Sequence, residues 1–303
     1  MTTTTSAPIE APAWFDPTLD LQPSTTAMIV GGQQPTVLPV VRIAGYQYHA
    51  KIGAPLEQFV LVDLSGTVVS PGKVLFDRDD KRGYFTDRVE VRLWFEDEPR
   101  LTVRQAGPAT SDEGGSASTS MSFSVSGGFF GETPTANVGW SISSGVSQQL
   151  PDFEIQKDVG SEGRAALRHA YVLRLIEGNV YYDPIDAVDA TSSGHIRRLP
   201  PKAGHDLDVF SSALFHTPTA IGATRRLRLQ ITHRVVCLEK TYQLPAMGTS
   251  GRPYDRSRSD SSQSCLVSCS LGWLKVDVGA VSVTHDWAFA VDLDHGDATV
   301  STV

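Results

Sequence analysis

The sequence predicts an all-β protein, a β-sandwich that carries one long hairpin. Three observations favour this class. Short strand-like runs recur between Gly- and Pro-containing turns, residues 225–236 alternate cleanly between apolar and polar, and residues 120–150 form two alternating arms around a Gly/Pro/Asn-containing connection. Period-two alternation is typical of strands with one buried face, and many such strands separated by turns indicate a sandwich or a barrel.

The first part of the chain begins with a segment rich in Thr and Pro, residues 1–27, which we expect to be an extended or disordered arm. Strand-like runs follow at residues 37–48, 59–69 and 89–96. We therefore assign residues 28–113 to the first part of the sandwich.

Residues 114–150 are predicted to form the hairpin, and Glu132 is the only charged residue between 120 and 150. The face opposite the apolar one is small, neutral and hydroxylated, which suits a closed membrane barrel better than a hairpin on a soluble core. Each arm, residues 119–130 and 137–148, has about a dozen residues, and a tilted strand needs about 9–11 to span a bilayer.

The alternation assigns the residues of both arms to two faces. The face expected to meet lipid contains Met121, Phe123, Val125, Phe129, Val138, Trp140, Ile142 and Val146. The face expected to line the water-filled lumen contains Ser120, Ser122, Ser124, Ser126, Asn137, Ser141, Ser143 and Ser147, with Gly128 and Gly139.

Residues 151–278 are predicted to complete the sandwich. Residues 164–176 fit either a helix or a strand, and the surrounding β signals favour a strand. A further strand pair is expected around residues 271–278. In residues 225–236 we expect Leu227, Leu229 and Ile231 to face the core and Arg226, Arg228 and Gln230 to face solvent.

The composition excludes several classes of function. With 303 residues and 40% hydrophobic residues the chain can bury a substantial core, and its net charge of -8 argues against general nucleic-acid binding. No run of 18 or more apolar residues occurs, so no transmembrane helix is expected. The N-terminus lacks a basic segment followed by an apolar one, so we expect no signal peptide within this chain.

No catalytic or metal-binding motif is evident, and we predict neither an enzyme nor a cofactor. The eight histidines form no HExxH motif or similar spacing, and His233 is expected to be a core histidine because it shares a parity with apolar neighbours. A cluster near the C-terminus resembles a calcium loop only loosely, and a solvated acidic turn is the favoured interpretation: Asp292, Asp294, His295 and Asp297.

Three cysteines, Cys237, Cys265 and Cys269, have no metal-site spacing. On one strand Cys265 and Cys269 would lie roughly 13 Å apart, which is too far for a disulfide. We expect buried or idle thiols.

Six segments of the chain follow one another in a distinctive order: FVLVDLSGTVVSPGKV, YFTDRVEVRLWFEDEPRLTV, SFSVSGGFFGETPTANVGWSISSGVSQQLPDFEI, NVYYDPIDAV, VFSSALFHTPTA and YQLPAMGTSGRPYDR. Together they resemble the staphylococcal leukocidin/α-haemolysin family of β-barrel pore-forming toxins over roughly residues 45–278. The resemblance implies a Gly-rich stem hairpin that returns to the sandwich at Pro151-Asp152-Phe153. Residues 279–303 extend past the usual end of the family and form a C-terminal extension.

The resemblance implies a secreted, soluble monomer that keeps the hairpin folded as a prestem, binds a target membrane and assembles into a ring. Each copy then contributes two strands to one transmembrane barrel. The implied partners are membrane lipid, with phosphocholine headgroups as one candidate, or a surface receptor. Further copies of the chain would form a ring of roughly seven or eight, and a second toxin component is an open alternative.

Two rim loops, near residues 179–200 and 245–262, are implied to contact the membrane. Tyr suits the bilayer interface and Arg suits lipid phosphates. The candidates are Tyr181, Tyr182, Ile185, Arg197, Arg198, Arg252, Tyr254 and Arg256.

Two other functions remain open from the sequence alone. One is a β-sandwich binding module, a lectin or an adhesin, whose hairpin is an exposed loop. The other is an enzyme with a dispersed active site, which no motif supports. The nearly uncharged hairpin favours the pore-forming toxin, because a lectin has no need to keep some 35 residues almost free of charge.

Overall fold

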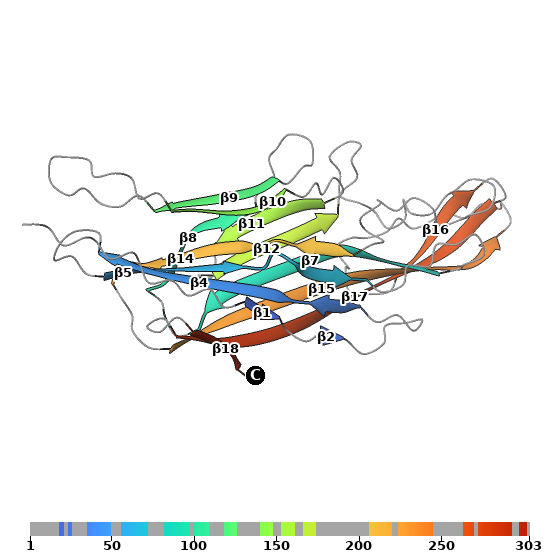
Figure 1. The fold of residues 1–303 in the computed structure, drawn as a ribbon. Coiled ribbons are helices and arrows are strands. Elements are labelled where there is room, and N and C mark those ends of the chain that lie inside the picture. Colours follow the sequence, from blue (N-terminus) through green and yellow to red (C-terminus); the bar gives the residue numbers. More distant parts are fainter. Residues whose placement is uncertain are drawn as a thin grey trace, which may run out of the picture.

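The structure, a computed structural model, consists of antiparallel β-strands throughout the residues that it describes (Figure 1). Two large sheets face each other and enclose a common core, and a smaller sheet and a separate two-stranded hairpin complete the fold. The predicted all-β class is therefore confirmed. The described residues are 18–20, 24–25, 35–49, 56–71, 82–96, 98, 100–108, 118–125, 140–147, 153–160, 166–173, 206–219, 224–244, 263–269, 272–292 and 297–301.

The first large sheet has five strands, and its edge strand β8 leads toward the hairpin. Its order is β1 (Thr18–Asp20), β4 (Val40–His49), β5 (Leu56–Asp63), β14 (Ser212–Thr217) and β8 (Thr102–Gly107). The strand β1 lies within the segment expected as an N-terminal arm and pairs with β4.

The second large sheet has seven strands and includes the two longest in the structure. Its order is β11 (Phe153–Val159), β12 (Ala166–Leu173), β7 (Arg82–Phe95), β15 (Thr224–Leu244), β17 (Gly272–Asp292) and β16 (Gln263–Cys269), with β18 (Asp297–Ser301) paired to the other end of β17. The segment 164–176, which fitted a helix or a strand, contains β12, so the strand prediction is confirmed. The strand β17 runs without a break through residue 278, where we expected the C-terminal extension to begin.

The small sheet contains β13 (Leu207–Val209), β6 (Thr67–Ser70), β3 (Thr36–Leu38) and β2 (Ser24–Thr25). A tight turn leads into β6, and Gly66 in this turn has a φ of 97°, a left-handed conformation that disfavours any side chain. The Thr67 hydroxyl is buried and bonds both the N–H and the carbonyl of Val40, at 3.0 and 3.1 Å. The Gly-Thr pair of the sequence thus fixes how β6 meets the strand β4.

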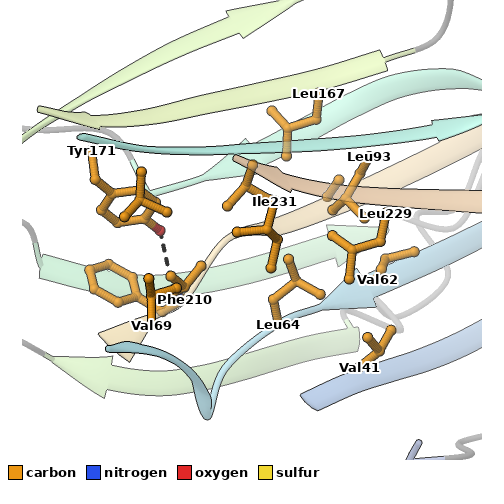
Figure 2. Packing of buried hydrophobic residues seen from close by; sticks show 14 of the residues in the cluster. Val41, Val62, Leu64, Val69, Leu93, Leu167, Tyr171, Phe210, Leu229 and Ile231 are labelled. Carbon is orange, nitrogen blue, oxygen red and sulfur yellow. Dashed lines mark hydrogen bonds between the residues drawn. The ribbon is translucent and has the colours of Figure 1, made fainter. Parts of the chain in front are cut away.

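The core lies between the two large sheets and is made of side chains at alternate positions. In β15 the residues Leu227, Leu229 and Ile231 are fully buried, as the alternation predicted. Figure 2 shows Leu229 and Ile231 beside Val62 of β5 and Leu64, which directly follows β5. Burial of this kind stabilises the fold by about 1.5–3 kcal/mol for each large side chain, so the alternation in the sequence accounts for the buried face of β15.

Candidate functional site: the inserted hairpin

The hairpin is the feature with the clearest functional potential, and it forms a sheet of its own. The strands β9 (Ser118–Val125) and β10 (Trp140–Ser147) pair antiparallel over their whole length. The predicted pairing of the two arms is therefore confirmed for these strands. The register places Phe123 opposite Ile142 and Ser124 opposite Ser141.

The hairpin is inserted between edge strands of the two large sheets. The chain leaves the five-stranded sheet at the end of β8, forms the hairpin, and enters the seven-stranded sheet at the start of β11. Figure 1 shows β9 and β10 along the side of the sandwich formed by these two edges, where β9 contacts β8. The Lys157 ammonium donates a 3.4 Å hydrogen bond to the Ala106 carbonyl and so joins the two edges directly.

Several strands end or begin at one end of the seven-stranded sheet, which we call the Arg82 end after the first residue of β7. The strands β12 and β15 run in the same direction because both are antiparallel to β7. Val172 and Arg234 both lie opposite Arg88, so both strands run toward the Arg82 end. The strand β11 begins beside the end of β12, because Phe153 lies opposite Leu173.

The chain leaves the five-stranded sheet toward the hairpin at a point that also lies near the end of β12. The last residue of β8, Gly107, lies opposite Ser212 of β14. The neighbouring Ser211 hydroxyl lies 3.0 Å from the Tyr171 hydroxyl, near the C-terminal end of β12. Both attachments of the hairpin therefore lie beside the C-terminal end of β12, which points toward the Arg82 end and is level with the middle of β7. The paired ends of β15 and β17 project beyond the sandwich at the Arg82 end together with β16 (Figure 1).

A buried polar network connects the two sheets close to these attachments. Ser211 Oγ lies 2.9 Å from Nδ1 of His169 and 3.0 Å from the Tyr171 hydroxyl, and all three residues are completely buried. The Phe210 N–H donates to the Tyr171 hydroxyl, a contact drawn in Figure 2. Burial raises the pKa of Tyr171 well above its usual range, so its hydroxyl stays neutral.

A second buried histidine, His233 of β15, is completely buried as expected for a core histidine. Its Nε2 lies 2.8 Å from the Thr86 hydroxyl. Burial, with a smaller contribution from His285, lowers the pKa of His233 to about 3. The ring is therefore neutral at physiological pH.

The outer face of the seven-stranded sheet carries ion pairs, centred on Glu90 of β7. Its carboxylate contacts Arg88 at 3.2 Å and both Arg92 and Arg168 at 2.8 Å. Burial alone would raise the pKa of Glu90, but Arg168 and Arg92 outweigh it and hold the pKa below its ordinary value. Because Arg168 belongs to β12, the cluster ties β7 to the strand that pairs with β11.

The predicted site residues fall partly within the described structure. On β9 lie Ser120, Met121, Ser122, Phe123, Ser124 and Val125, and on β10 lie Trp140, Ser141, Ile142, Ser143, Val146 and Ser147. The remaining hairpin candidates, Ser126, Gly128, Phe129, Asn137, Val138 and Gly139, lie outside the described residues. The same holds for all of the rim candidates: Tyr181, Tyr182, Ile185, Arg197, Arg198, Arg252, Tyr254 and Arg256.

Within the described ranges, no three His, Cys, Asp or Glu side chains gather as a metal ion would require. In the same part of the chain, no helix is long and apolar enough to cross a membrane. Cys237 is not in a disulfide, and Cys265 and Cys269 lie on the single strand β16.

Sequence reasoning missed the network of His169, Tyr171 and Ser211. A signal for part of it was present, because His169 shares its parity with the apolar Leu167 and should face the core with it. No sequence pattern indicated that Ser211, which directly precedes β14 of the opposite sheet, would be the partner.

No protein-family profile and no characterised protein matches the chain by sequence. Solved structures with a similar fold are nevertheless found. The δ-toxin of Clostridium perfringens superposes with a TM-score of 0.52 at 9% identity, covering 92% of this chain and 97% of the toxin. A pore-forming protein superposes with a TM-score of 0.54 at 8% identity, covering 92% of this chain and 100% of that protein.

The membrane-inserted form of the C. perfringens NetB toxin also superposes, with a TM-score of 0.50 at 7% identity, covering 96% of this chain and 100% of the toxin. At such low identity the similarity establishes the fold. That fold agrees with the resemblance inferred from the order of the six sequence segments.

Proposed function

We propose that this chain, which has the fold of the leukocidin/α-haemolysin β-barrel toxins, is a pore-forming cytolysin. It binds a target membrane as a secreted, soluble monomer, assembles with other copies into a ring, and inserts the hairpin of β9 and β10 into a shared barrel. The observation that carries the proposal is the register of this hairpin. The proposal involves no catalytic step and no cofactor.

The register aligns the expected lipid face of β9 with that of β10, and the expected lumen face of β9 with that of β10. Residues that lie directly opposite each other in an antiparallel pair share one face of the sheet. Phe123 with Ile142 and Val125 with Trp140 would therefore share the lipid face, whereas Ser124 with Ser141 would share the lumen face. A shift by one residue would mix the two sets, so the pairing supports a strand pair with one apolar and one hydroxylated side.

The position of the hairpin supports its release. The strands β9 and β10 pair with each other and form a sheet separate from both large sheets. Detaching them would therefore break none of the described strand pairs of the sandwich. In a ring the strands of neighbouring copies would pair in turn, so the barrel would close and leave no unpaired edge in lipid.

The direction of the strands supports an orientation in which the Arg82 end of the sandwich faces the membrane. The expected rim loops, near residues 179–200 and 245–262, come after β12 and β15, which both run toward this end. Both attachments of the hairpin lie beside the end of β12. We propose that the rim candidates, such as Tyr181 and Arg252, contact lipid headgroups or a receptor from the Arg82 end.

The experiment that tests the function is dye release from liposomes of several lipid compositions, with the same samples viewed by negative-stain electron microscopy. We expect release of the dye and ring-shaped particles, either directly or after limited proteolysis of the N-terminal segment. Binding to membranes or glycans without dye release under any of these conditions would favour a β-sandwich binding module instead.

A further inference from the structure

We propose that His169 and His233 form an acid-sensitive latch, so that mild acidification favours opening of the sandwich beside the hairpin attachments and thereby promotes release of the hairpin. The biological purpose of the latch rests on the proposed pore-forming function. The latch itself is a property of the sandwich and can be tested without a membrane.

The two histidines occupy neighbouring rows on the inner face of the seven-stranded sheet. His169 lies opposite Val91, and His233 lies opposite Val89 on the same strand β7. A third histidine, His285, belongs to the His169 row, because Ile231 lies opposite both Val91 and His285. Both His169 and His233 are completely buried, and His285 is 8% exposed.

Among the described residues, each of the two buried rings has a hydrogen-bond partner at only one of its nitrogens. The Nδ1 of His169 meets Ser211, and the Nε2 of His233 meets Thr86. Within the described structure, Nε2 of His169 and Nδ1 of His233 are buried without a partner. A protonated imidazole has two N–H donors. Whichever tautomer is present, protonation of either ring in place would leave a buried cationic donor without an acceptor.

In the described part of the chain, the charged and titratable groups around the two rings do not compensate a positive charge on them. Lys157 of β11 lies opposite His169 and repels its cation, and Tyr171 beside it is neutral. His285 disfavours a charge on His233. The facing sheet contributes the carboxylate of Asp63. Its hydrogen bonds with described residues come from Ser65 and Ser212 and not from either histidine.

These surroundings fix the direction of the pH effect. Burial, aided by Lys157, lowers the pKa of His169 to about 3, and the pKa of His233 is lowered to a similar value. An exposed histidine has a pKa of about 6.5, so the closed sandwich binds fewer protons than an opened one. The closed form therefore has its full stability above about pH 6.5 and loses it progressively as the pH falls toward about 3.

The expected size of the effect is large enough to act as a switch. If opening exposes one of these histidines, lowering the pH from 7.5 to 5.0 raises the opening constant about 30-fold, and exposure of both raises it about 10³-fold. His169 is bonded to Ser211, at the end where β8 stops and β11 starts. Opening at this position would loosen both attachments of the hairpin together.

The test is amide hydrogen exchange at pH 7.5 and 5.0 without lipid, corrected for the intrinsic pH dependence of exchange. We expect the protection of the segments Thr102–Gly107 and Phe153–Val159 to fall by tenfold or more in the wild type. The single variants His169→Gln and His233→Gln should each lose a large part of this acid response. Wild-type protection that is unchanged by pH, or an undiminished response in both variants, would overturn the proposal.

His216→Gln is the matched control. His216 has a carboxylate partner, Glu57, at 2.8 Å and lies toward the opposite end of β14. We expect this variant to keep the acid response of the wild type, and its loss would contradict the assignment. Should the core variants not fold, histidine-ring NMR of the wild type decides. Folded molecules should show His169 and His233 neutral at pH 5.0, and titration of both near 6.5 would overturn the latch.

Dye release from phosphatidylcholine vesicles, measured at the same two pH values, separates the latch from the proposed function. A latch in a pore-forming protein predicts faster release at pH 5.0 and a weaker acceleration in the histidine variants. Acid-induced opening in solution without any dye release would support the latch and contradict the pore. Equal dye release at both pH values, with no opening in solution, would support the pore and contradict the latch.

Discussion

The hydroxyl of Tyr171 lies 3.0 Å from the hydroxyl of Ser211, and this contact connects the two sheets of the sandwich where the hairpin is attached. Tyr171 also accepts a hydrogen bond from the Phe210 N–H, and its ring packs edge-on against the Phe210 ring, with the centroids 5.9 Å apart. One buried side chain therefore supplies both a polar and an apolar link between the sheets.

Replacing Tyr171 with Phe should lower the free energy of unfolding by about 1–3 kcal/mol, because the buried Phe210 N–H and the Ser211 hydroxyl each lose a partner. Urea denaturation followed by circular dichroism measures the change. The variant Thr232→Val is a suitable control, since its hydroxyl pairs with Thr284 on the exposed outer face and should matter by less than about 0.5 kcal/mol. Equal costs for both variants would contradict the role of Tyr171 as a link between the sheets.

Glu90→Gln should destabilise the protein by about 1–3 kcal/mol at pH 7, because three arginines lose a shared carboxylate. The folded pKa of Glu90 is lowered, so its contribution is present above about pH 4.5 and is lost as the pH falls below that value. Urea denaturation at pH 7 and at about pH 3.5 should therefore show the difference between variant and wild type shrinking at the lower pH.

The matched control for this cluster is Glu96→Gln, because Glu96 is more exposed and its contacts with Arg226 and Arg228 are longer, at 3.4 and 3.3 Å. An exposed pair of this kind contributes less than about 1 kcal/mol. A larger loss from Glu96→Gln than from Glu90→Gln would contradict the central position of Glu90.

A disulfide between cysteines at Ser124 and Ser141 should form readily, because these residues lie directly opposite each other in the hairpin. The native cysteines would first be replaced. If β9 and β10 keep this pairing in the barrel, the oxidised protein should still release dye from liposomes. The offset pair Ser122 and Ser141 should form the bond poorly, and equal yields for the two pairs would show that the register differs.

Those parts of the sandwich that follow from the pattern of neighbouring residues could be predicted from the sequence. In β15 the alternation of Leu227, Leu229 and Ile231 with polar residues reports burial directly, and the structure confirms it. The pairing of β9 with β10 was also predictable, since the two arms follow each other along the chain and share one pattern.

The features that could not be predicted from the sequence depend on contacts between distant segments of the chain. Ser211 meets His169 only because two sheets stack, and no local pattern encodes that contact. The extent of β17 was equally hidden, because its pairing with β15 continues from Trp273 to Asp292, well past the expected end of the sandwich at residue 278. The ion cluster around Glu90 likewise requires β12 and β7 to be neighbours.

The facing of the hairpin can be tested at two adjacent residues, Ser124 and Val125, with a single arginine at each. Arginine at Val125 would place a charge in hydrocarbon, at a cost of about 2–4 kcal/mol for each strand near the bilayer midplane. Every copy in a ring would carry this cost, so insertion should fail. Arginine at Ser124 would point into the water-filled lumen and should permit insertion. Circular dichroism must first show that both monomers are folded.

Single-channel recording of the two variants in planar bilayers tests the proposed function most directly. We expect no channels from Val125→Arg, and channels from Ser124→Arg with altered conductance and a selectivity shifted toward anions. The same contrast should appear at Ile142 and Ser141 on the other strand. Normal conductance from Val125→Arg together with failure of Ser124→Arg would reverse the assigned faces, and equally mild effects at all four positions would contradict membrane insertion of this hairpin.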